Sequence, residues 1–318
     1  QKWYPVHAGF LSTLTRREQR FVRAVDDVSF TIEAGEMLGL AGESGSGKTT
    51  TGELLVRLQD PTAGEILFNG EDVATLDDEA LKRFRRGAQV IFQDPYQTLN
   101  PRFTVLQTVM EPLRIHQIGD RAERLERVID ALDKAELRPA REFLHRFPHQ
   151  LSGGQRQRVA IARAIVLQPH FLVADEPVSM LDVSIRAGVL NLLRRLKEEM
   201  GLTMLYITHD LSTLRYICNR TAIMYLGRIA EIGPTADVID RSLHPYTQAL
   251  IAAVPRIQPD SRRQVVRIEG EIPDPIDLPR GCRFRPRCPQ AFEACFEEPE
   301  LQEVAPGHWV ACHLYSNE

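Results

Sequence analysis

One glycine-rich segment, Gly42-Glu-Ser-Gly-Ser-Gly-Lys48-Thr49, constrains this chain more than any other. It fits the pattern GxxxxGK[ST], follows a buried apolar run at residues 37–40 and precedes a helical pattern at residues 49–58. A strand, a glycine loop and a helix in that order form a P-loop, in which backbone N–H groups and the helix N-terminus cradle phosphates. The segment therefore predicts an α/β fold of the P-loop NTPase type with a bound nucleotide.

The polar residues of this loop have expected partners on Mg-ATP. Lys48 should reach the β- and γ-phosphates, and the Thr49 hydroxyl should hold Mg²⁺. The other loop residues expected around the phosphates are Gly42, Ser44, Gly45, Ser46, Gly47 and Thr50.

An acidic pair follows a second buried apolar run, residues 171–174. A strand there would deliver Asp175 beside the Mg²⁺ ion. The next carboxylate, Glu176, could then polarise a water for attack on the γ-phosphate. Both residues are therefore candidates for the ATP-hydrolysing site.

Size and charge exclude several classes of protein. The 318 residues suffice for one large domain with an appendage, and the net charge of −4 does not suggest a nucleic-acid partner. The longest apolar run found, residues 249–254, is far shorter than the roughly 20 residues of a membrane span. No signal peptide is recognisable, so a cytoplasmic protein is expected.

Hydrophobic periodicity gives the expected elements. The expected strands are residues 25–32, 37–40, 65–68, 89–92, 171–174, 203–208, 222–226 and 228–232. The expected helices are residues 49–58, 154–166 and 183–200, with a helical insert over residues 103–136. Hairpin turns are expected at Asn69-Gly70 and at Gly227. The composition turns proline-rich after Pro255, which divides the chain into residues 1–254 and a linker and tail over residues 255–318.

The segment Leu151-Ser152-Gly153-Gly154-Gln155 is the most specific feature in the chain. It places small residues at a helix N-terminus and so makes a second anion site, without a lysine. A second such site indicates a second nucleotide or a second subunit. This segment resembles the signature motif of the ABC ATPase family, and the resemblance extends over residues 1 to about 254. The family's fold is an ABC-type nucleotide-binding domain with an antiparallel β subdomain and a helical subdomain, here at about residues 100–160. The resemblance implies that each ATP lies between the P-loop of one subunit and the signature of the other.

Further motifs follow in the family's order. Gln93 resembles the Q-loop glutamine near the metal and the γ-phosphate, residues 179–182 with Asp182 resemble the D-loop at the dimer interface, and His209 resembles the γ-phosphate histidine. Residues 2–5 resemble the stretch that stacks on adenine, which favours Tyr4, with Trp3 and Phe10 as alternatives. Family members have a strand ahead of that stretch, so a shortened N-terminus is expected.

Three stretches resemble the ATPases of oligopeptide and dipeptide importers: residues 93–101, 244–250 and 281–289. The resemblance implies an ATP-hydrolysing subunit that powers peptide uptake from the cytoplasmic face of the membrane. Its implied partners are a second, related ATPase in a heterodimer, two transmembrane permease subunits and an extracytoplasmic substrate-binding protein. The alternatives are an importer of nickel or other metal chelates or of oligosaccharides, an exporter half, a soluble ABC ATPase, and a redox-sensing binding module.

Four cysteines gather in the tail: Cys282, Cys288, Cys295 and Cys312. In a reducing compartment such a group indicates a metal site rather than disulfides. The spacing fits neither zinc CxxC pairs nor the ferredoxin pattern, while the family resemblance implies a [4Fe–4S] cluster. Zinc, with His308 or His313, and unligated cysteines remain the alternatives. Cys218 is expected to be a core residue.

Overall fold

The computed structural model describes residues 1–6, 19–253 and 270–316. The chain divides into two compact units. The first unit comprises Gln1–Thr31, Gly39–Glu65 and His209–Glu318, and the second comprises Ile32–Leu38 and Ile66–Thr208. Among the described helices, none has both the length and the hydropathy to cross a membrane.

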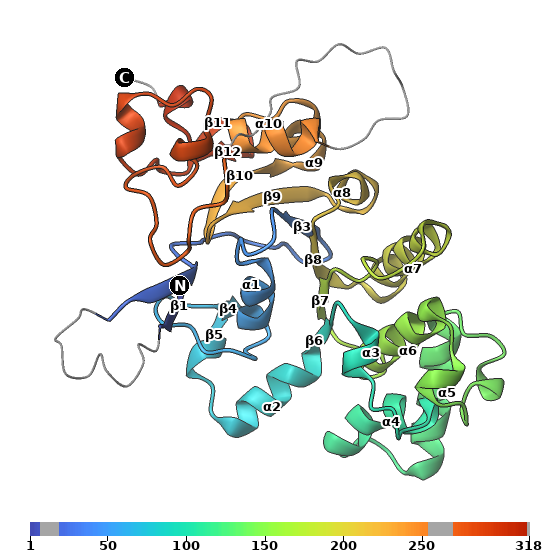
Figure 1. Cartoon of the computed structure of the whole chain (residues 1–318). Coiled ribbons are helices and arrows are strands. Elements are labelled where there is room, and N and C mark those ends of the chain that lie inside the picture. The colour runs from blue at the N-terminus through green and yellow to red at the C-terminus, as the bar shows by residue number, and fades with distance from the viewer. Residues whose placement is uncertain (7–18, 254–269, 317–318) are drawn as a thin grey trace. The chain divides into compact units, whose positions relative to one another are not determined.

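A parallel sheet organises the second unit (Figure 1). Strand β7 (Phe171–Asp175) lies between β6 (Ala88–Ile91) and β8 (Thr203–Thr208), parallel to both. Every residue of β7 is buried, which accounts for the apolar run at residues 171–174 ahead of Asp175. Because β6 and β7 run in the same direction, their carboxyl ends bring Gln93 and Asp175 to one edge of the sheet.

The helical insert expected over residues 103–136 is present. Helix α4 (Val105–Ile115) starts at a capping box of Thr104 and Gln107, and α5 (Arg121–Lys134) is capped by Asp120. Both pack against α6 (Gly153–Ile165). The unit also contains α3 (Pro95–Thr98) and α7 (Val183–Met200). The expected hairpin is formed by β4 (Leu67–Phe68) and β5 (Glu71–Asp72). The amphipathic helix α2 (Asp78–Gly87) was not predicted from the sequence.

The first unit contains an antiparallel sheet that includes residues from the C-terminal tail. Strand β10 (Arg228–Pro234) pairs with β9 (Arg220–Tyr225) on one side and with β12 (His308–Val310) on the other. Strand β11 (Gln302–Ala305) pairs with β12 at the edge. The tail, red in Figure 1, is therefore docked by strand pairing within this unit.

Gly227 forms the expected turn between β9 and β10. Its φ is 84°, and a Cβ there would lie 2.6 Å from the Arg23 carbonyl oxygen. Helices α8 (Leu211–Ile217), α9 (Thr235–Asp240) and α10 (Pro245–Ala252) flank the hairpin in sequence. Cys218 caps α8 and is half-buried, so its expected place in the core was wrong.

The strand expected over residues 25–32 was also wrong. The strand is β2 (Phe21–Val25), paired antiparallel with β1 (Lys2–Pro5). Asp27 has a φ of 57°, which ends the extended run despite the apolar alternation that follows. Residues 2–5 thus form a strand themselves, which the sequence analysis had not expected.

Candidate nucleotide-binding site

The P-loop joins β3 (Met37–Ala41) to α1 (Lys48–Leu55), as the sequence predicts. Two of its glycines cannot be replaced without a backbone clash. A Cβ on Gly42 would lie 2.1 Å from the Met224 carbonyl oxygen, and a Cβ on Gly47 would lie 2.0 Å from that of Ala24. Both also have positive φ, 153° and 102°. The loop therefore needs glycine for space as well as for conformation.

Lys48 is the first residue of α1, and only 6% of it is exposed. Its ammonium donates to the carbonyl oxygens of Gly42 and Glu43, both at 2.9 Å. These contacts hold the ammonium inside the loop, where a phosphate would lie. Thr49 is exposed at the helix N-terminus, and Ser44 and Gly45 are exposed in the loop.

The two aromatic residues of β1, Trp3 and Tyr4, form hydrogen bonds with different partners. The Tyr4 hydroxyl is hydrogen-bonded to the side chain of Thr50 in α1, and burial raises the pKa of Tyr4. The Trp3 indole instead donates to Asp26 Oδ1 at 2.9 Å, with the Arg23 guanidinium 4.7 Å from its ring centre. Tyr4 is thus the aromatic residue linked to the P-loop helix. Phe10, the other alternative for the adenine contact, lies outside the described residues.

Gln93 and Glu176 meet in the second unit. The Gln93 amide nitrogen donates to Glu176 Oε2 at 2.7 Å. Glu176 has a φ of 45°, a costly conformation for this residue type, and its backbone N–H donates to the Ile207 oxygen at 2.9 Å. Backbone strain of this kind is concentrated at functional sites. The neighbouring Asp175 ends β7 and is 6% exposed.

The donor set expected for Mg²⁺ suits that ion. A threonine hydroxyl, a carboxylate and an amide oxygen are all oxygen ligands, which Mg²⁺ prefers. The Gln93 nitrogen is used toward Glu176, so its amide oxygen is the atom left for a cation. Asp175 and Gln93 belong to the second unit, and Thr49 and His209 to the first. His209 follows β8 directly and is exposed.

The signature segment begins α6. Ser152 is its N-cap and exchanges hydrogen bonds with Gln155, in which Ser152 Oγ accepts from the Gln155 N–H at 3.2 Å and Gln155 Oε1 accepts from the Ser152 N–H at 3.0 Å. A Cβ on Gly154 would lie 2.8 Å from Ile185 Cγ2 of α7, whereas one on Gly153 would have ordinary contacts. This capping box and the glycines present backbone N–H groups at the helix end, as an anion site requires.

The expected D-loop, residues 179–182, leads into α7. Asp182 is the N-cap of α7 but makes no capping hydrogen bond through its side chain. Its apolar neighbours Met180 and Val183 are 59% and 80% exposed. Ser179 donates through its N–H and hydroxyl to the Glu176 carbonyl oxygen, at 3.1 and 3.0 Å, which ties the D-loop to the catalytic candidate.

All four tail cysteines line one small cavity and carry free thiols. Burial raises the pKa of Cys282 and of Cys312 to about 11, and it raises the pKa of Cys288 as well. In the described part of the chain, however, no group of three or more His, Cys, Asp or Glu side chains is placed to hold a metal ion. The metal site therefore remains a prediction.

The histidines considered for zinc have other partners. His308 Nε2 lies 2.8 Å from Glu231 Oε1, and both side chains are buried. His313 Nε2 lies 3.1 Å from the Glu297 carbonyl oxygen.

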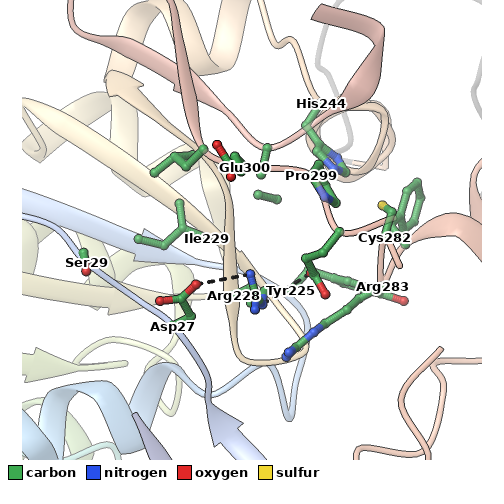
Figure 2. Close-up of a pocket in the computed structure, with 15 residues that line it drawn as sticks. Asp27, Ser29, Tyr225, Arg228, Ile229, His244, Cys282, Arg283, Pro299 and Glu300 are labelled. Atoms are coloured by element: carbon green, nitrogen blue, oxygen red, sulfur yellow. Dashed lines mark ion pairs between the residues drawn. The ribbon is translucent and has the colours of Figure 1, made fainter. Parts of the chain in front are cut away.

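A cavity of about 490 Å³ lies in the first unit, beside β9, β10 and the tail (Figure 2). Arg228 extends toward Asp27 at 3.5 Å in this cavity, and its Nε lies 3.3 Å from Glu298. His244 also lines it, and burial lowers the pKa of this histidine to about 4. None of the lining residues belongs to the P-loop, so this cavity is not the phosphate site.

Sequence reasoning missed a set of residues that hold the P-loop from outside it. Tyr246 Oη accepts a hydrogen bond from the Glu43 N–H at 2.8 Å, and Arg287 forms an ion pair with the Glu43 carboxylate at 2.7 Å. Tyr246 lies in residues 244–250 and Arg287 in residues 281–289, two of the stretches that resemble peptide-importer ATPases. The only signals in the sequence were a tyrosine within the first stretch and an arginine next to Cys288 in the second.

Comparisons with known proteins identify the family of the chain. The family profile described as ABC transporter matches residues 25–179, and that described as oligopeptide/dipeptide transporter, C-terminal region, matches residues 230–295. A provisionally named peptide import ATP-binding protein of Brucella ovis is 53% identical over 292 residues, which are 92% of each chain. The oligopeptide transport ATP-binding protein AppF of Bacillus subtilis is 47% identical over 320 residues, covering 99% of this chain and 95% of that one.

A solved structure supports the same assignment. The dimeric structure of MJ0796, a bacterial ABC transporter cassette, matches with a TM-score of 0.63 and 33% identity, over 73% of this chain and 96% of that one. The expected ABC-type P-loop fold is thus confirmed. This chain belongs to the family of ABC transporter ATP-binding proteins that carry an oligopeptide/dipeptide transporter C-terminal region.

Proposed function

We propose that this chain is the ATP-hydrolysing subunit of an importer that carries peptides across the cytoplasmic membrane. The observation that carries the proposal is the match to AppF, an oligopeptide transport ATP-binding protein, over 99% of this chain. The match includes the tail as well as the ATPase core. We divide the protein at residues 254 and 255 into that core and a linker with the tail. Residues 255–269 of the linker lie outside the described residues.

The proposed roles follow from the chemistry of ATP hydrolysis. Lys48 neutralises the β- and γ-phosphates, while Thr49 and Asp175 hold the Mg²⁺ ion with Gln93. When bound, that ion would supply positive charge that offsets the charge developing in the transition state. Glu176 orients and deprotonates the attacking water. The remaining contacts to ATP come from Tyr4 at adenine, His209 at the γ-phosphate, and the loop residues Gly42, Ser44, Gly45, Ser46, Gly47 and Thr50.

A second ATPase subunit completes each site. In this proposal the signature segment of one subunit faces the γ-phosphate bound by the other subunit; its residues there are Ser152, Gly153, Gly154 and Gln155. Asp182 of the D-loop extends across the interface between the subunits. The exposed Met180 and Val183 beside Asp182 support a protein contact there, because large apolar side chains in a cluster mark interaction surfaces. We propose a heterodimer with a related ATPase.

The membrane partners are two permease subunits, fed by an extracytoplasmic substrate-binding protein. The ATPase would then lie peripherally on the cytoplasmic face of the membrane. The helical insert from Phe103 onward would receive a cytoplasmic helix of a permease, and the exposed Ile115 of α4 (57%) would be an apolar anchor there.

Peptide-stimulated ATP turnover tests the transport proposal. The chain is co-expressed with its membrane and substrate-binding subunits and reconstituted in lipid. Peptides are expected to raise ATP hydrolysis above the basal rate, while sugars and metal chelates leave it unchanged. Stimulation by either of the latter would overturn the choice of cargo, and no response to any class would contradict the importer assignment.

The tail cysteines are proposed to bind a [4Fe–4S] cluster, with zinc as the alternative. The common cavity supports a shared ligand, and four thiolates suit either metal. The described geometry gives no ready coordination set, so binding would require the side chains to reorient.

Metal and sulfide analysis of anaerobically purified protein decides between these ligands. We expect iron and acid-labile sulfide in equal amounts, lost together when the cysteines are replaced by serine. Stoichiometric zinc without sulfide would exclude the cluster, and absence of both would leave a tail of free thiols.

A further inference from the structure

The P-loop is anchored to the C-terminal tail through Glu43. Arg287 Nη1 donates to Glu43 Oε2 at 2.7 Å, and Nη2 donates to Glu43 Oε1 at 3.1 Å. This two-pronged contact joins residues 244 positions apart in sequence. Because a planar guanidinium and a carboxylate match in this geometry, the pair fixes direction as well as distance.

The pair is shielded from water. The Arg287 side chain is 7% exposed and the Glu43 side chain 23%. Arg287 also donates to the Tyr225 hydroxyl at 3.2 Å, and its hydrogen bonds to Glu43 raise its pKa. A charge pair in such surroundings is strongly coupled, because removal of one partner leaves the other charge with little solvent.

Glu43 is also held through its backbone. Its N–H donates to Tyr246 Oη at 2.8 Å, and its carbonyl oxygen accepts from the Lys48 ammonium at 2.9 Å. Tyr246 is fully buried, with its ring centre 4.6 Å from that of Tyr225. Glu43 therefore joins the two: its carboxylate binds Arg287, and its carbonyl oxygen accepts a hydrogen bond from Lys48.

A second arginine of the same tail segment reaches the neighbouring turn. Arg283 pairs with Asp26 and donates to the Leu226 carbonyl oxygen. The next residue, Gly227, donates its N–H to the Ser46 oxygen of the P-loop at 2.9 Å. Figure 2 shows Arg283 extending from the tail beside Cys282. The tail thus contacts the P-loop directly through Arg287 and Glu43, and it contacts the turn that holds Ser46 through Arg283.

We propose that Arg287 is a positioning residue for ATP binding: through Glu43 it holds the P-loop, and with it Lys48, in the conformation that receives the phosphates. Arg287 does not touch the nucleotide. Its loss lets the Glu43 segment move, so ATP must order the loop as it binds, and affinity falls while chemistry in the bound state is retained.

The test measures ATP turnover against ATP concentration in the reconstituted assembly, together with equilibrium Mg-ATP binding to the full chain. Arg287→Ala is expected to raise KM for ATP and the dissociation constant about tenfold, with kcat changed less than about twofold. Arg287→Lys should raise KM and the dissociation constant less than Arg287→Ala does, because lysine keeps the positive charge but cannot make the two-pronged contact. Unchanged KM and affinity in Arg287→Ala would overturn the inference.

Arg285→Ala is the matched control. Arg285 lies in the same turn, but its guanidinium sits 3.9 Å from the Phe296 ring centre, within the tail. This variant should perturb the tail and leave KM for ATP unchanged. An equal loss of affinity in Arg285→Ala would mean that general damage to the tail, rather than the ion pair, is responsible.

Glu43→Gln tests the same contact without altering the tail, in case Arg287→Ala does not fold. It should raise KM as Arg287→Ala does, and the double variant should be no worse than either single one. Additive losses would overturn the inference. It rests on the proposed nucleotide site, and native protein that fails to bind Mg-ATP would refute that site instead.

Discussion

Glu176→Gln is expected to lower ATP turnover about a thousandfold while ATP binding persists. Glutamine keeps the size of the side chain and can still contact Gln93, which now donates to Glu176 at 2.7 Å. It cannot take a proton from water. In the proposed dimer, ATP should therefore stay intact between the two subunits and keep them closed. Turnover measurements together with size-exclusion chromatography in Mg-ATP would detect both effects.

Glu126→Gln is a suitable control for the change of charge. Glu126 lies on α5, 3.7 Å from Arg141, and both side chains are 69% exposed. An exposed pair of this kind contributes little, so activity should equal that of the native chain. Near-native turnover by Glu176→Gln itself would remove Glu176 from the role of base.

Local sequence was sufficient to predict the phosphate-binding elements. The glycines at residues 42 and 47 are required by positive φ and by nearby backbone oxygens, so a short pattern identifies the loop. The helix start expected near Gly154 is also confirmed, and the capping box that fixes it joins Ser152 to Gln155, only three residues apart. Helix α7 and strand β8 also match their expected bounds, because each has an uninterrupted pattern and Gly201 ends the helix.

Long-range contacts were beyond such reasoning. Nothing near Glu43 in sequence indicates that Arg287, 244 residues later, would bind it. The tail strands β11 and β12 have only four and three residues, too few for a periodic signal, and they exist because β10 offers an edge. The apolar alternation after Val25 misled for the converse reason, since Asp27 turns the chain before a ladder can continue.

Gly47→Ala is expected to weaken ATP binding at least about a hundredfold, because displacement of a binding loop by about 1 Å has effects of that size. The added Cβ would lie 2.0 Å from the Ala24 carbonyl oxygen at a φ of 102°. The backbone oxygen cannot rotate away as a side chain could, so the loop itself must shift. Isothermal titration with Mg-ATP measures the loss directly.

The control for Gly47→Ala separates crowding from backbone conformation. Gly70 has a φ of 83°, but a Cβ there meets no atom within 4 Å. Gly70→Ala should therefore cost about 1 kcal/mol of stability from strain alone and bind ATP normally. In thermal denaturation, Mg-ATP should raise the midpoint of Gly70→Ala as it does for the native chain and raise that of Gly47→Ala much less. An undiminished ATP-induced rise in Gly47→Ala would show that the loop tolerates a side chain, and the close-packed glycine would then not explain how the phosphates are held.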